Sequence, residues 1–135
     1  KKKGRVITLS NPQVAVLTDY KLIFQDFSGT RECSVASITP SKGGEVYGVL
    51  FETDENSLKN LDLKEGRKYK RIIIDVVIEA NEEPIDEVKG VTTYINLLNV
   101  GLPNKKYRNV IIEGAKEHGL PVDYIEELKA IKTSD

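Results

Sequence analysis

The feature that most constrains the fold is a segment of two-residue alternation from Tyr69 to Glu79. Its apolar face is made of Ile72, Ile74, Val76 and Ile78. Because successive side chains of a strand point to opposite faces of a sheet, this pattern predicts a strand with one buried face. The turn signal Asn81-Glu82-Glu83-Pro84 follows, and Val88 to Leu98 then predicts an antiparallel partner.

Shorter strands are predicted before this pair. They cover 14–17 and 20–24 around a turn at Thr18-Asp19, 33–38 followed by a loop at 39–44, and 46–52. Gly48 in the last of them indicates a bulge or a close backbone approach. Asp54 is a good helix cap, and it predicts a short helix that ends near Glu65 and Gly66.

Two helices are predicted at the C-terminus. The first covers 104–118 and ends at Gly119, and its apolar stripe is made of Tyr107, Val110, Ile111 and Ala115. Pro121 opens the second, whose inward residues are predicted to be Val122, Ile125 and Leu128. Strands followed by helices predict an α+β fold, with residues 1–135 forming a single domain. We expect a small mixed β-barrel or roll with flanking helices.

Composition narrows the classes of partner. The chain has 20 Lys plus Arg and 21 Asp plus Glu, and this net charge of -1 argues against nucleic acid or an anionic membrane as the main partner. No apolar run is long enough to span a membrane. Cys33 is the only cysteine, so no internal disulfide can form, and we expect a small buried thiol and a cytoplasmic location.

The usual motifs for metal or cofactor chemistry are absent. His118 is the only histidine, and its place at a predicted helix end is explained by the helix dipole. One histidine and one cysteine cannot make an ordinary zinc site. The sequence has neither a phosphate-binding glycine loop nor a dinucleotide fingerprint. We therefore predict that stability and any activity are independent of metal.

Among many carboxylates, Glu65 is distinguished by its position. It lies between a predicted helix and the strongest strand, beside Gly66 and a few residues before Tyr69. A half-buried carboxylate at the mouth of a rolled sheet can have its pKa raised toward the range useful for proton transfer. The alternative is a surface or cap residue.

Four parts of the chain, in the right order, resemble the gamma-glutamylcyclotransferase family. Val46-Tyr47-Gly48-Val49-Leu50-Phe51 resembles the family strand V-x-G-V-L-Y. The family spacing L-x-x-L-D-x-x-E-G is matched by Leu58, Leu61, Asp62, Glu65 and Gly66. The C-terminal helices match at Tyr107, Gly114-Ala115, Glu117, Gly119-Leu120-Pro121, Tyr124 and Leu128. The opening resembles the family at Asn11-Pro12, Asp19-Tyr20-Lys21-Leu22 and Phe24.

The resemblance implies a cofactor-independent enzyme that acts on a small-molecule γ-glutamyl amino acid or γ-glutamylamine. The α-amine of the γ-glutamyl group attacks its own γ-carbonyl, which closes 5-oxoproline and releases the amine. Glu65 is then the general acid/base, and Tyr69, Tyr94 and Tyr107 line the pocket. The alternative for each tyrosine is a packed ring with a satisfied hydroxyl.

Two departures from the family pattern leave alternatives open. Cys33-Ser34 stands where the family usually has Gly-Gly, so the pocket wall and the substrate are expected to differ. The family's N-terminal strand and Y-G-S-N loop, which supplies backbone donors to the substrate, correspond to positions upstream of Lys1. Either they precede Lys1, or this protein has lost them. A chain starting at Lys1 is expected to be inactive and to associate, for instance as a homodimer, through an unpaired sheet edge. The alternatives are a non-catalytic small-ligand-binding domain of the same fold and a cyclotransferase acting on a larger γ-glutamyl metabolite.

Overall fold

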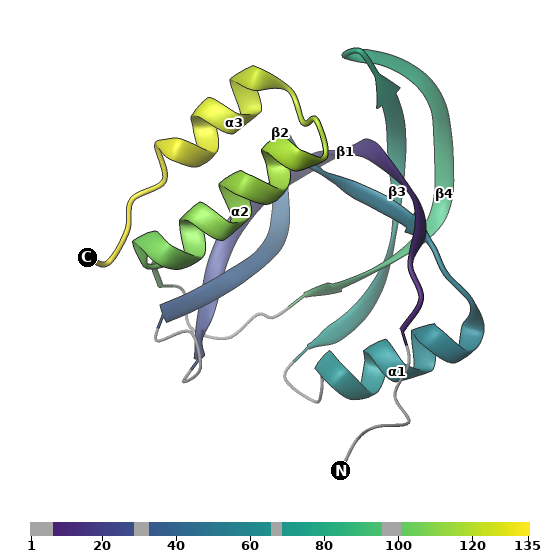
Figure 1. Cartoon of the computed structure of the whole chain (residues 1–135), viewed down its shortest axis with the longest axis horizontal. Coiled ribbons are helices and arrows are strands. Elements are labelled where there is room, and N and C mark those ends of the chain that lie inside the picture. The colour runs from purple at the N-terminus through teal and green to yellow at the C-terminus, as the bar shows by residue number, and fades with distance from the viewer. Residues whose placement is uncertain (1–6, 29–32, 66–68, 96–100) are drawn as a thin grey trace.

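The computed structural model describes residues 7–28, 33–65, 69–95 and 101–135. The elements are β1 (Ser10–Ser28), β2 (Cys33–Glu52), α1 (Glu55–Glu65), β3 (Lys70–Ala80), β4 (Glu83–Ile95), α2 (Lys105–Glu117) and α3 (Val122–Lys129). The strands form one antiparallel sheet in the order β2-β1-β3-β4. Figure 1 shows this sheet curled into a half-barrel, with α2 and α3 side by side over β1–β2 and α1 on the other side of the molecule. The predicted α+β class with two C-terminal helices is confirmed.

The first half of the sheet is made of two long strands, so the prediction of four shorter ones is wrong. β1 and β2 pair along almost their whole length, with a register irregularity between Thr18 and Tyr20. At this point Asp19 has a φ of 65°, and its carboxylate accepts a hydrogen bond of 3.0 Å from the Gly43 N–H. The predicted turn is therefore a bulge, and the predicted loop at 39–44 is the part of β2 that faces it. A bulge bends a strand without ending it.

Two apolar clusters cover opposite faces of β1–β2. The first joins α2 and α3 to the sheet, and its buried members are Ile112, Ala115, Leu120, Tyr124, Ile125 and Leu128. The second fills the inside of the curled sheet around Ala15, Leu17 and Val76. The end of β2 contributes to both, since Tyr47 and Val49 pack against the first cluster and Val46 and Leu50 against the second.

Gly48 pairs in regular register with Ala15 between these alternating side chains. A Cβ at Gly48 meets nothing within 4 Å, so the predicted bulge or close approach at this glycine is wrong.

Burial raises the pKa of the Tyr124 hydroxyl, and the Tyr124 ring lies 5.1 Å from the ring of Tyr47.

The boundaries of the C-terminal helices agree with the sequence signals. Asn104 caps α2 by accepting a hydrogen bond of 2.8 Å from the Tyr107 N–H, and Gly119, with a φ of 74°, follows its end. The predicted inward faces are partly wrong, because Val110 and Val122 are exposed. Ile112 and Tyr124 are buried near these positions in the respective helices. In both helices, the buried side is therefore rotated about the helix axis relative to the side that residue spacing alone predicts.

The remaining elements place the candidate site. Asp54 caps α1 as predicted, and hydrogen bonds from Ser57 lower the pKa of the Asp54 carboxyl. The hairpin β3–β4 turns at Asn81 and Glu82, whose φ values of 53° and 63° match a two-residue turn with both residues left-handed. β4 begins at Glu83, earlier than predicted. Positions 96–98, which the predicted strand included, lie outside the described residues.

Candidate active site

The candidate site lies where the end of α1 meets the start of β3 and the end of β4. Glu65 is the last residue of α1, so of the two places that the sequence allowed, the helix end and the turn beyond it, the structure has the first. Its side chain is outside the part of the chain that the structure describes. The described side chains of the neighbouring elements therefore define the surroundings of this position.

Three polar side chains meet here, each from a different element. The Tyr94 hydroxyl of β4 donates a hydrogen bond of 2.5 Å to Asp62 Oδ1 of α1. Arg71 Nη1 of β3 lies 3.7 Å from the other carboxylate oxygen, Asp62 Oδ2. Asp62 thus connects the helix to both strands of the hairpin.

The local folding of each element explains this convergence. Arg71 and Tyr94 are direct partners in the antiparallel register of β3 and β4, so their side chains share one face of the sheet. Position 65 follows Asp62 by three residues, and positions three apart lie on the same side of a helix. Tyr94 and Glu65 were predicted as site residues from the sequence, whereas the contact between Asp62 and Arg71 was not. The available signal was the acidic residue one turn before Glu65 in the family motif.

The three predicted tyrosines are not all in one place. Tyr69 is half-buried directly before β3, two residues from Arg71, and therefore lies near the end of α1 together with Tyr94. Tyr107 packs elsewhere, between α2 and the first two strands. Its hydroxyl accepts a hydrogen bond of 2.9 Å from the Ala36 N–H, and its ring meets Phe24 edge-on at 6.2 Å. These contacts show that Tyr107 has a packed ring and a bonded hydroxyl.

Replacing Tyr107 by phenylalanine is expected to reduce the free energy of unfolding by about 1–3 kcal/mol, because a partly buried Ala36 N–H loses its acceptor. The measurement is urea denaturation, with Tyr20→Phe as the matched control. If Tyr107→Phe instead leaves stability unchanged and raises the KM for a γ-glutamyl substrate, the hydroxyl serves the pocket and not the packing.

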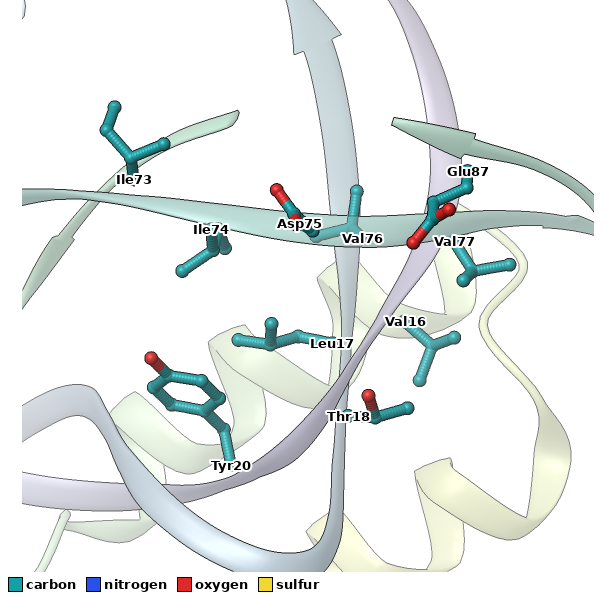
Figure 2. A pocket seen from close by; sticks show the side chains of 10 residues that line it. All are labelled: Val16, Leu17, Thr18, Tyr20, Ile73, Ile74, Asp75, Val76, Val77 and Glu87. Atoms are coloured by element: carbon teal, nitrogen blue, oxygen red, sulfur yellow. The ribbon is translucent and has the colours of Figure 1, made fainter. Parts of the chain in front are cut away.

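A hollow of about 420 Å³ opens between β1 and β3 (Figure 2). The two strands pair only at Ala15–Ile78 and Val16–Val77, and they diverge beyond this point. The lining includes consecutive residues of both strands, 16–18 of β1 and 73–77 of β3. Consecutive residues point to opposite faces, so the hollow lies in the plane of the sheet, between two strand edges. Tyr69, Tyr94 and Tyr107 are not among the described residues that line it.

No group of three or more potential metal ligands occurs among the residues that the structure describes. His118 is the C-cap of α2, and its ring meets Phe51 edge-on at 6.0 Å. This placement agrees with a helix-end role for His118. The side chain of Cys33 lies outside the described residues. In the described ranges, no helix is both long and apolar enough to cross a membrane.

Comparison with known proteins identifies the family. Residues 45–128 match the model of the AIG2-like family. The chain is 35% identical to a gamma-glutamylcyclotransferase of Homo sapiens over 96% of its own length and 73% of the relative's, and 33% identical to that of Mus musculus with the same coverage. A solved structure named gamma-glutamyl cyclotransferase superposes with a TM-score of 0.82 at 34% identity, covering 91% of this chain and 75% of the other. The chain therefore belongs to the AIG2-like family and is a relative of the gamma-glutamylcyclotransferases.

Proposed function

We propose that this protein converts a γ-glutamyl amino acid or γ-glutamylamine into 5-oxoproline and a free amine. The observation that carries the proposal is the family motif in its structural setting. Glu65 ends α1 one turn after Asp62, which contacts both strands of the hairpin. The similarity to gamma-glutamylcyclotransferases over nearly the whole chain supports the same reaction.

In this proposal Glu65 conveys protons between the two nitrogens of the substrate. It takes a proton from the α-ammonium, and the resulting amine attacks the γ-carbonyl carbon to form a tetrahedral intermediate. Collapse of this intermediate breaks the bond to the leaving nitrogen, which receives a proton from Glu65. The carboxylate then takes the second proton from the attacking nitrogen and passes it to the released amine. Overall, the α-nitrogen loses two protons and the leaving nitrogen gains two, so no water is consumed. One carboxylate can serve both steps because both nitrogens are attached to the same carbon of the intermediate.

The tyrosines have different parts in this proposal. Tyr94 and Tyr69 lie near the end of α1, where they can border the substrate. Tyr94 also helps to hold Asp62, and through it the last turn of the helix. Tyr107, on α2, has two roles in this proposal. Its hydroxyl accepts the hydrogen bond from the Ala36 N–H, and its side chain also lines the pocket.

The oxyanion of the intermediate requires donors aimed at it. We propose that they come from a strand and loop of the Tyr-Gly-Ser-Asn type that precedes Lys1 and pairs in the hollow between β1 and β3. The hollow supports this placement, since it lies in the sheet plane and each bordering strand has an edge unpaired beyond the Val16–Val77 contact, within the described residues. About a quarter of the length of the human relative also lies outside the matched region.

The test is chromatographic detection of 5-oxoproline after incubation with γ-glutamyl dipeptides and γ-glutamylamines. We expect release of equal amounts of 5-oxoproline and amine. The assay is made with protein that carries the upstream strand, since the donors are proposed to come from it.

Exhaustive chelation is expected to change neither this rate nor the melting temperature, because the mechanism assigns every step to a carboxylate and backbone donors. Activity that is lost in chelator and restored by a divalent ion would refute the metal-free mechanism. Binding of γ-glutamyl compounds without turnover would favour the non-catalytic alternative.

We further place this reaction in the cytoplasm. A single cysteine in the whole sequence supports a reducing compartment. Size-exclusion chromatography of the same preparation tests whether the protein forms a homodimer.

A further inference from the structure

Arg71 is a loosely held cation beside the end of α1. Its Nη1 atom lies 3.7 Å from Asp62 Oδ2, which is longer than a hydrogen bond, and this is its one ion pair among the described residues. The side chain is 44% exposed. A guanidinium carries five N–H donors in a rigid, planar fork, so most of the donors of Arg71 are open to a ligand.

Asp62 does not engage this fork in the bidentate way that arginine and carboxylates favour. Its other oxygen, Oδ1, is taken by the Tyr94 hydroxyl. Asp62 therefore orients Arg71 and Tyr94 side by side but leaves one face of the guanidinium unused. Such an arrangement fits a binding residue that is held in place by a neighbouring acid.

We propose that Arg71 binds a carboxylate of the substrate, and this inference rests on the proposed function. Position 65 is about 4.5 Å further along the helix axis than Asp62, so a substrate that reacts at Glu65 comes within reach of the fork. A γ-glutamyl amino acid carries two carboxylates, each a few bonds from the reacting carbonyl. One belongs to the γ-glutamyl group and the other to the leaving amino acid. Two parallel N–H···O bonds from Arg71 suit either of them.

The experiment compares Arg71→Met with the wild type on two substrates, γ-glutamylalanine and γ-glutamylethylamide, of which only the first has a carboxylate on its leaving group. We expect the KM for γ-glutamylalanine to rise on the order of 10- to 100-fold, as for loss of a charge-assisted hydrogen-bonded pair. The kcat is expected to change far less. The melting temperature should stay close to that of the wild type, because an ion pair this exposed contributes little to stability.

Two further variants serve as controls. Arg71→Lys keeps the charge and removes the fork, so it should recover only part of the lost affinity. Lys70→Gln removes a neighbouring charge from the opposite face of β3 and should leave both KM values unchanged.

The substrate dependence identifies the carboxylate. A rise in KM for γ-glutamylalanine alone assigns Arg71 to the leaving amino acid, and a rise for both substrates assigns it to the γ-glutamyl group. Unchanged KM values for both overturn the inference while the turnover itself still supports the proposed function. Absence of wild-type turnover on both substrates overturns the proposed function, and the inference with it.

Discussion

Replacing Glu65 by glutamine is expected to lower kcat for 5-oxoproline release by roughly 10²- to 10⁴-fold or more. Glutamine has nearly the shape of glutamate but cannot accept a proton from the α-ammonium at neutral pH. The folded structure should persist, because Glu65 is the last residue of α1 and glutamine nearly preserves the shape of the side chain. The measurement combines steady-state kinetics on a γ-glutamyl dipeptide with a melting curve.

Glu55→Gln is the matched control, since it makes the same chemical change in the exposed first turn of the same helix. It should retain nearly full activity. Full activity of Glu65→Gln would end the assignment of this residue as the general acid/base. If its melting temperature collapsed instead, Glu65 would be a structural residue of the helix end.

Truncating Leu128 to alanine is expected to reduce the free energy of unfolding by about 2–5 kcal/mol. Leu128 is 3% exposed and belongs to the cluster that attaches α2 and α3 to the sheet. α3 has 8 residues, too few to be a stable helix on its own, so its packing stabilises it. Chemical denaturation monitored by circular dichroism gives the value.

Val122→Ala is the control within the same helix. Val122 is 68% exposed, and its truncation should change stability by no more than about 0.5 kcal/mol. Equal effects of the two substitutions would contradict the orientation of α3 on the sheet. This pair therefore tests the inward face of α3, for which the spacing predicted Leu128 correctly and Val122 incorrectly.

Features encoded by a few adjacent residues were predictable from the sequence. The Asn104 cap and Gly119 delimit α2, and Asp54 begins the helix that ends at Glu65. The alternation after Tyr69 predicts β3 to within one residue. Each of these signals acts within about one turn of helix or along one strand, where hydrogen bonds and side-chain periodicity are local.

The tertiary structure decided the features that depend on contacts between distant residues. The local pair Thr18-Asp19 resembles a turn. β1 nevertheless continues through this point, because the Asp19 carboxylate accepts a hydrogen bond from Gly43, 24 residues away. The face that α3 buries is set by the sheet surface it packs on, which includes Tyr47 and Val49. In the candidate site, the sequence supplied the family motif around Glu65, but only the pairing of β3 with β4 brings Arg71 and Tyr94 together at Asp62. Such contacts join residues far apart in the chain, and their geometry depends on how the whole sheet curls, which no local spacing encodes.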